Sequence, residues 1–256
     1  MIGRLFKSKN EESVQSPLPL APGRVVYAIG DIHGRADLLK KMLSKIREDI
    51  YNHSPSSPLI VFLGDYIDRG DDSAEVLSII EQMWIDKSGC QHTFLKGNHE
   101  AALLEFLDSP ETNSEWLRFG GLQTLHSFGL GGVNEYSDRA DLTEAVRKLR
   151  EKLASQEIFL RVGLQLSVQV GNIFFCHAAI DATRRLDDQP EDVLLWGKPG
   201  FTKGRALRDA WVIHGHTVSP EPDIGHNRIG IDTGAYYTGR LTAARISDGN
   251  LRFLST

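Results

Sequence analysis

The stretch LIVFLGDYIDRG, residues 59–70, constrains the fold more than any other part of the chain. A nearly continuous apolar run that ends at a glycine indicates a buried strand, and Asp65 follows at the point where that strand emerges. Asp65, Asp68 and Arg69 then supply two carboxylates and a guanidinium within five residues. Open α/β sheets keep their active sites at the carboxyl ends of strands, so this loop is a candidate site.

Two further stretches repeat this unit. RVVYAIG leads into Asp31 and His33, and HTFLKG leads into Asn98 and His99. A helical pattern with apolar residues three and four apart follows each of the three strands. Right-handed β-α-β connections make such strands parallel, so we expect the three loops to meet at one edge of a sheet.

The second half of the chain has a different pattern. Residues 114–163 are predicted to be helical and to form a cap beside the site. LQLSVQV and IFFCH then flank a Gly-Asn pair, which is a hairpin signal. IFFCH ends at His177, and WVIHGHT supplies His214 and His216, while RIGIDTG, LTAARI and NLRFLST are predicted to complete a second sheet. We therefore expect an α/β (α+β) fold in which two sheets form a sandwich flanked by helices, with metal-binding residues at one rim.

Length and composition narrow the class of protein. The 256 residues fit one domain over residues 24–256, after a polar, proline-containing tail over residues 1–23 that is predicted to be disordered. The net charge of -5 argues against a nucleic-acid-binding surface, and no apolar run approaches the roughly 20 residues that span a bilayer. We expect a cytoplasmic protein without a nucleic-acid or membrane partner. Cys90 and Cys176 show no CxxC spacing and are interpreted as core residues.

Six side chains on the strand-end loops form a candidate ligand set without a thiolate. They are Asp31, His33, Asp65, Asn98, His177 and His216. Imidazole, carboxylate and amide oxygen suit Mn²⁺, Fe or Zn²⁺ better than Cu(I). Six ligands exceed the need of one ion, and with a bridging carboxylate they fit two ions about 3.5–4 Å apart, as in two-metal hydrolytic sites.

Six short blocks together resemble the calcineurin-like metallophosphoesterases and, within them, the phosphoprotein phosphatase branch. The blocks are GDIHG (30–34), GDYIDRG (64–70), GNHE (97–100), CHA (176–178), GHT (215–217) and IDTGA (231–235). They occur in the family's order within residues 24–246. Within these blocks, the sequences YIDRG, NHE and HA are similar to those of the bacterial members and of their plant relatives, the Rhizobiales-like phosphatases.

The resemblance implies the metallophosphatase fold, a dinuclear metal site and a metal-activated water that attacks phosphorus. Under it, Asp31 and His33 would hold the first ion, Asp65 would bridge, and Asn98, His177 and His216 would hold the second.

The same resemblance implies roles for the remaining polar residues of these loops. His99 would be the general acid for the leaving oxygen, and Asp68 would fix its tautomer. Arg69 and Asn98 would bind phosphoryl oxygens, with Arg69 acting as a bidentate clamp.

Two positions depart from the family's pattern. LLWGKPG places Lys198 where the family usually has a second phosphate-binding arginine, and a lysine keeps the charge but loses the planar fork. HAA places Ala179 where the family usually has glycine, and its side chain would narrow the site. His214 is either a group that orients the site or a strand-interior residue. The remaining histidines have no motif around them and are interpreted as surface or structural residues: His53, His92, His126 and His226.

The leading hypothesis is a dinuclear, Mn²⁺-dependent phosphomonoesterase acting on phosphoserine, phosphothreonine or phosphotyrosine in proteins. The alternative within enzymes is a dinucleoside polyphosphate hydrolase similar to the symmetrical diadenosine tetraphosphatases. A third hypothesis is a metal-binding interaction module without catalysis, and the presence of Asp68, Arg69 and His99 speaks against it. The physiological substrate, the native metal and the oligomeric state are left open by the sequence.

Overall fold

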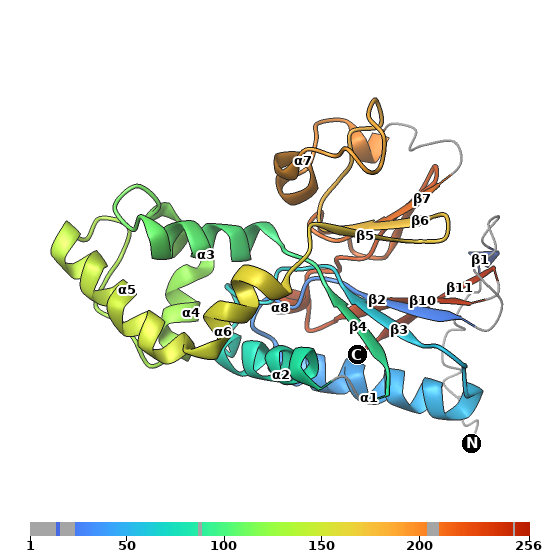
Figure 1. Ribbon diagram of the computed structural model, residues 1–256, viewed down its shortest axis with the longest axis horizontal. Coiled ribbons are helices and arrows are strands. Elements are labelled where there is room, and N and C mark those ends of the chain that lie inside the picture. The colour runs from blue at the N-terminus through green and yellow to red at the C-terminus, as the bar shows by residue number, and fades with distance from the viewer. Residues whose placement is uncertain (1–13, 16–23, 87–88, 204–209, 248) are drawn as a thin grey trace, which may run out of the picture.

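Two β-sheets lie at the centre of the molecule, and helices lie outside them (Figure 1). The computed structural model describes residues 14–15, 24–86, 89–203, 210–247 and 249–256. The helix-flanked sandwich predicted from the sequence is confirmed.

The first sheet has six strands in the order β1-β11-β10-β2-β3-β4. β2, β3 and β4 are parallel, as the repeated strand-loop-helix unit predicts, whereas β10 and β11 are antiparallel to their neighbours. The strands are β1 (Val14–Gln15), β2 (Val25–Ile29), β3 (Leu59–Phe62), β4 (Gln91–Phe94), β10 (Thr242–Ser247) and β11 (Asn250–Ser255).

The second sheet has five strands in the order β5-β6-β7-β9-β8. The predicted hairpin is present, because β5 and β6 pair antiparallel across Gly171 and Asn172. β6, β7 and β9 are parallel. The strands are β5 (Ser167–Val170), β6 (Ile173–Cys176), β7 (Trp211–His214), β8 (Asp223–Gly225) and β9 (Arg228–Gly230).

The prediction that LTAARI and NLRFLST join the second sheet is wrong. These segments are β10 and β11, and β10 pairs with β2 of the first sheet, with Ala243 opposite Ile29. All six residues of β10 are buried. Its polar residues, Arg245 and Ser247 among them, are buried with the apolar ones, so alternation along the sequence does not indicate which sheet the strand enters.

Alternation along β2 divides the hydrophobic core into two layers. Tyr27 and Ile29 belong to the layer beneath α1 (Ala36–His53) and α2 (Ser73–Ile85). Val26 and Ala28 belong to the layer between the two sheets, which includes Phe175 of β6. Because both layers need apolar side chains, the strand reads as an uninterrupted apolar run.

A helical lobe projects from one end of the sandwich (Figure 1). Its main helices are α3 (Asn98–Asp108) and α5 (Arg139–Leu153), and α5 buries a stripe that includes Leu142, Val146 and Leu149. Shorter elements complete the lobe and the rest of the chain: a π-helical turn at Leu117–Gly121, α4 (Leu122–Ser127), α6 (Ser155–Ile158), a π-helical turn at Phe159–Gly163, α7 (Glu191–Trp196), a 3₁₀ turn at Phe201–Lys203 and α8 (Ala235–Thr238).

Val14 and Gln15, within the predicted disordered tail, form β1 and pair with β11. The other residues of that tail lie outside the described part of the chain. Cys90 and Cys176 are both free thiols, with Cys176 buried and Cys90 half-buried.

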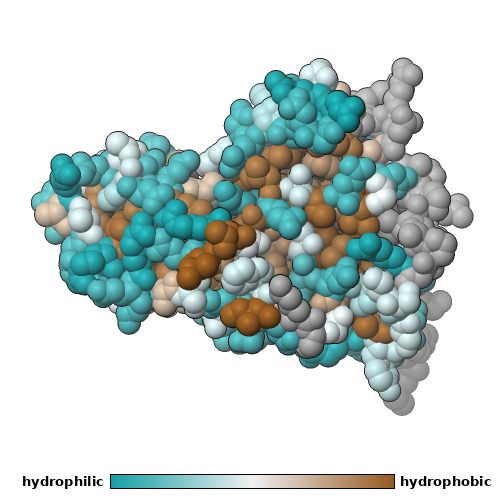
Figure 2. Space-filling view, in the orientation of Figure 1, coloured by the Kyte–Doolittle hydropathy of each residue, from teal (hydrophilic) through white to brown (hydrophobic). Residues whose placement is uncertain are grey.

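On the face shown in Figure 2, hydrophobic residues gather where the sandwich meets the lobe, and hydrophilic residues cover much of the lobe. In the described ranges, none of the helices is both long and apolar enough to cross a membrane.

Candidate active site

The parallel strands of the first sheet bring the three predicted loops to one edge. β2 is followed by Asp31 and His33, β3 by Asp65, and β4 by Asn98 and His99. The backbone N–H groups of Ile32 and His33 both donate to the Asp65 carbonyl, at 3.0 and 2.9 Å. The first two loops are therefore in direct contact.

The second sheet delivers its histidines to the same place. His177 follows β6, His216 lies two residues after β7, and the Gly215 N–H donates to the His177 carbonyl at 2.8 Å. A Cβ at Gly215 would overlap the carboxylate of Asp31, so only glycine allows the two sheets to approach this closely. The Asp31 carboxylate accepts the His216 N–H at 3.0 and 3.2 Å.

Two triads of potential metal-binding atoms share the carboxylate of Asp65. One contains His33 and His99, and the other contains His177 and His216. Asp65 Oδ2 lies 3.5 Å from Nε2 of both His33 and His177. Asp65 therefore lies between the two groups of histidines, close to a ring nitrogen of each.

Asn98 completes the second group. Its Oδ1 atom lies 2.9 Å from His177 Nε2 and 3.0 Å from His216 Nδ1. The structure thus brings together all six residues of the predicted ligand set. Asp31 joins them through the hydrogen bonds that its carboxylate accepts from the His216 backbone N–H.

The orientations of the imidazole rings suit a cation. His33 Nδ1 donates to the Ile67 carbonyl and His177 Nδ1 to the Leu63 carbonyl, which leaves each Nε2 lone pair facing Asp65. Among the described residues, His33 Nε2 has no hydrogen-bond partner although it is buried. Burial lowers the pKa of His33 to about 3, against the opposing effect of Asp65, so the ring is neutral and able to bind a metal.

The buried carboxyl groups of Asp31 and Asp232 lie close to these rings. Burial, together with Asp232 and Asp65, raises the pKa of Asp31 well above its usual range. Burial also raises the pKa of Asp232, whose Oδ2 atom has no hydrogen-bond partner in the described chain. A cation among these oxygens and neutral imidazoles would relieve both the repulsion and the unsatisfied polar atoms, so the residues present fit divalent metals.

His99 lies beside this cluster, between Asp68 and Arg69. His99 Nδ1 donates to Asp68 Oδ2 at 2.6 Å, and Arg69 Nη2 lies 3.1 Å from His99 Nε2. Burial lowers the pKa of His99, but the carboxylates of Asp65 and Asp68 outweigh it and raise the pKa to about 9. The imidazole can therefore hold a proton for a neighbouring group.

The helical lobe supplies two residues that sequence analysis missed. Trp116 Nε1 donates to Asp68 Oδ2 at 2.8 Å, and Thr124 Oγ1 donates to Asp68 Oδ1 at 2.6 Å. Both carboxylate oxygens of Asp68 are thus fixed from the lobe. No local motif marks these residues, because their role follows from a tertiary contact.

Glu100 is a further residue that was missed, although it stands in the GNHE block. Its buried carboxylate accepts N–H bonds from Asp65, Tyr66 and Gly97 at 2.8–2.9 Å, and from Ile67 at 3.4 Å. It thereby joins the loop after β3 to the loop after β4.

The loop after β3 needs such support. Three non-glycine residues in it have positive φ angles: Asp65 (51°), Asp68 (72°) and Arg69 (68°). Left-handed backbone of this kind costs about 1–3 kcal/mol a residue and persists where the surroundings enforce it.

Lys198 and His214 lie differently from the ligand set. Lys198 Nζ pairs with Asp181 Oδ2 at 2.6 Å, and its side chain is 40% exposed. The preceding Gly197 faces Ala178 and His216, so the loop itself borders the site. His214 is buried at the end of β7, where its ring contacts Phe201.

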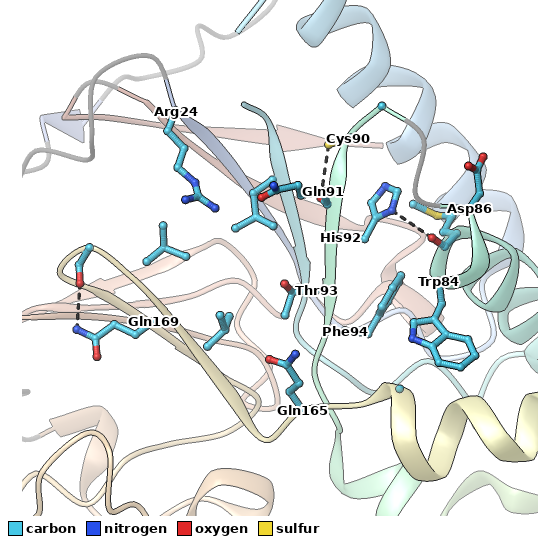
Figure 3. A pocket seen from close by; sticks show the side chains of 17 residues that line it. Arg24, Trp84, Asp86, Cys90, Gln91, His92, Thr93, Phe94, Gln165 and Gln169 are labelled. Carbon is cyan, nitrogen blue, oxygen red and sulfur yellow. Dashed lines mark hydrogen bonds between the residues drawn. The ribbon is translucent and has the colours of Figure 1, made fainter. Parts of the chain in front are cut away.

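A separate cavity of about 690 Å³ lies between β4 and the β5 hairpin (Figure 3). Its wall includes Arg24, Trp84, Gln91, Gln165 and Gln169. None of the candidate site residues lines it, so it is distinct from the metal-binding cluster.

Comparisons with known proteins identify the family of the chain. The sequence model of the calcineurin-like phosphoesterase family matches residues 24–246. The chain is 37% identical to serine/threonine-protein phosphatase 2 of Escherichia coli over 229 residues, which cover 87% of this chain and 93% of that protein. It is 29% identical to the asymmetrical bis(5'-nucleosyl)-tetraphosphatase PrpE of Oceanobacillus iheyensis over 239 residues, covering 86% and 88% of the two chains.

Among solved structures, a cold-active protein-tyrosine phosphatase of a Shewanella species matches with a TM-score of 0.52 and 16% identity, over 99% of this chain and 89% of that one. At this identity the likeness concerns the fold. The family match over most of the chain, together with the six ordered blocks, shows that the protein belongs to the calcineurin-like metallophosphoesterases, and its curated relatives support the phosphoprotein phosphatase family within them.

Proposed function

We propose that this protein is a two-metal phosphomonoesterase that removes phosphate from serine, threonine or tyrosine side chains of proteins. One observation supports it most: the carboxylate of Asp65 lies within reach of His33 on one side and of His177 and His216 on the other, and His99, which also lies near Asp65, is bonded to Asp68 and contacts Arg69. Such an arrangement can position a phosphoryl group between two cations and a proton donor.

In this proposal Asp31, His33 and Asp65 would hold one divalent ion, and Asp65, Asn98, His177 and His216 would hold the other. The oxygen and imidazole donors suit Mn²⁺ best, with Fe or Zn²⁺ as alternatives. When bound, the ion pair supplies the positive charge that activates a water and neutralises phosphoryl oxygens.

The protein's own groups act on the leaving oxygen and the phosphoryl oxygens. His99 gives the proton on Nε2 to the leaving oxygen, and Asp68 stabilises the protonated ring through Nδ1. Arg69 points its guanidinium at the same nitrogen, so it must turn toward the phosphoryl oxygens before His99 can deliver the proton. Asn98 and Lys198 are the further phosphate-binding groups of this proposal, and Lys198 would have to leave Asp181.

The bridging role of Asp65 provides the test. Asp65→Asn should abolish turnover and lower the metal content from two equivalents, measured by elemental analysis of the purified protein. Glu105→Gln, an exposed change on α3, is the matched control. Near wild-type activity and two bound equivalents in Asp65→Asn would refute the site.

Hydrolysis of dinucleoside polyphosphates is the second candidate, because a relative at 29% identity carries that name. The relative named as a protein phosphatase is 37% identical, which is the reason for placing phosphoproteins first. Turnover of phosphopeptides and of diadenosine tetraphosphate, measured side by side with Mn²⁺, separates the two substrates.

A further inference from the structure

Two adjacent tyrosines extend the metal-binding cluster toward solvent. Tyr236 packs its ring edge-to-face on His33, with centroids 5.5 Å apart, and its face lies 5.0 Å from the Arg69 guanidinium carbon. Tyr237 packs on Tyr236 at 4.9 Å and is 60% exposed. We call this pair the tyrosine ledge.

The segment that carries the ledge is held firmly. Gly234 has a φ of 67°, and a Cβ there would overlap the ring of Tyr237, so the glycine makes room for that ring. Arg35 Nη1 donates to the Ala235 carbonyl at 3.0 Å, and Thr238 Oγ1 donates to the carbonyls of Thr233 and Gly234 at 2.9 Å. An exposed aromatic ring fixed in this way is preorganised for a flat partner.

The ledge adjoins the group that binds phosphate in the proposed function. The contacts of the Arg69 guanidinium in the described chain are with His99 and with Tyr236, and they include no ion pair. Its charge is therefore available to a phosphoryl group. Arg69 lies 5.0 Å from the Tyr236 ring and Tyr237 packs on Tyr236, so a ring attached to a phosphate held by Arg69 has both tyrosines within reach.

We propose that the tyrosine ledge is a subsite for an aromatic ring carried by the phosphorylated substrate. This inference rests on the proposed function and narrows its substrates to those with a ring near the phosphate. Stacking or edge-to-face contact with Tyr237 would favour substrates that carry a ring, because aromatic pairs contribute more binding free energy than their buried area alone accounts for. The ring is that of phosphotyrosine or that of a nucleobase.

Binding of two non-hydrolysable phosphonates tests the subsite without turnover. Calorimetry of the Mn²⁺-loaded full chain compares phenylphosphonate with methylphosphonate, which lacks the ring. The expected result is about 3- to 10-fold tighter binding of phenylphosphonate, the size of an aromatic pair. Tyr237→Leu should remove this advantage and Tyr237→Phe should keep it.

Tyr51→Leu is the matched control, because Tyr51 is 82% exposed in the last turn of α1, far along that helix from the site. Equal binding of the two phosphonates by the wild type, or an advantage that survives in Tyr237→Leu, would overturn the inference. If neither phosphonate binds, the proposed phosphate site itself is wrong, which is a different result.

Turnover then identifies where the ring comes from. The ratio of kcat/KM for a phosphotyrosine peptide over a phosphoserine peptide with the same flanks, and the kcat/KM for diadenosine tetraphosphate, are compared between wild type and Tyr237→Leu. A fall of about 3- to 10-fold in one of these quantities supports the ledge and names the source. Unchanged values for both would refute it.

Discussion

His99 is the residue whose two contacts define its role most sharply, because Nδ1 is bonded to Asp68 and Nε2 lies 3.1 Å from Arg69 Nη2. His99→Asn should lower kcat by about 10²- to 10⁴-fold, since it removes a proton donor. Aryl esters with a good leaving group, such as p-nitrophenyl phosphate, should lose less than alkyl phosphates.

Steady-state kinetics on both classes of ester, with metal analysis of the same preparations, checks this role. The metal content should stay near that of the wild type, in contrast to Asp65→Asn. Equal losses on both esters would mean that His99 does not protonate the leaving group.

Glu100 tests whether the loop after β3 depends on its buried anion. Glu100→Gln keeps the shape of the side chain. Its NH₂ group, however, would face two backbone N–H groups that now donate hydrogen bonds to the carboxyl oxygens. Each buried donor left unsatisfied costs about 1–3 kcal/mol, so the free energy of unfolding should fall by at least that much.

Chemical denaturation measures this loss, and Glu105→Gln on the same helix is the control. Metal affinity should fall as well, because the backbone of Asp65 is bonded directly to the Glu100 carboxyl group. Unfolding curves that coincide with those of the wild type would show that other contacts hold the loop.

Lys198 is one of the two positions that depart from the family's pattern, and in the structure its side chain pairs with Asp181. If it leaves Asp181 to bind phosphate, Lys198→Ala should raise KM for phosphomonoesters, and Lys198→Arg should lower KM by restoring a planar, two-donor contact.

Steady-state kinetics on one phosphopeptide at saturating Mn²⁺ measures both variants. Values for Lys198→Ala within about twofold of the wild type would assign Lys198 to its ion pair, because exposed pairs of this kind contribute little to binding or stability. Arg69 would then be the basic residue that binds the phosphate.

At the scale of elements, the lobe and the sandwich are linked through Asp68. Trp116→Phe removes the N–H that donates to Asp68 but keeps a ring that packs on Phe106, at 4.9 Å in the structure. Loss of a hydrogen bond to a charged group should lower the free energy of unfolding by about 1.5–3 kcal/mol and reduce kcat through misplacement of His99.

Denaturation and kinetics on an alkyl phosphate measure the two effects. Trp196→Phe, a change at a 53% exposed tryptophan of α7, controls for the substitution itself. Should kcat of Trp116→Phe equal that of the wild type, the lobe would have no part in holding the His99–Asp68 pair.

The elements also show what a sequence can and cannot specify. The three parallel strands were predictable because each is an apolar run that ends next to polar residues, and local order fixes their direction. β10 was misassigned because its six residues are buried on both faces, and nothing local selects β2 as its neighbour. Trp116 and Thr124 could not be predicted either, because they act through tertiary contacts with Asp68 that no local pattern indicates.

At the scale of the whole molecule, the proposed ligands come from both sheets, so bound metal should stabilise the sandwich as a unit. A ligand that binds only the folded state and is present at 100 times its Kd raises the free energy of unfolding by about 2.7 kcal/mol. The melting temperature should therefore rise when Mn²⁺ is added to chelator-treated protein, and it should respond less in Asp65→Asn. Differential scanning calorimetry measures both, and identical melting with Mn²⁺ and with EDTA would contradict the two-sheet site.

The pairing of β2 with β10 joins opposite ends of the chain, and this has a consequence for synthesis on the ribosome. β2 is made long before β10, so one of its edges stays open until β10 has been made. An unpaired strand edge is a template for wrong partners, and contacts between distant segments form slowly. A nascent chain in which Asp31, Asp65 and Asn98 have already been made thus still exposes an unpaired edge of β2, and β10 is the strand that covers it.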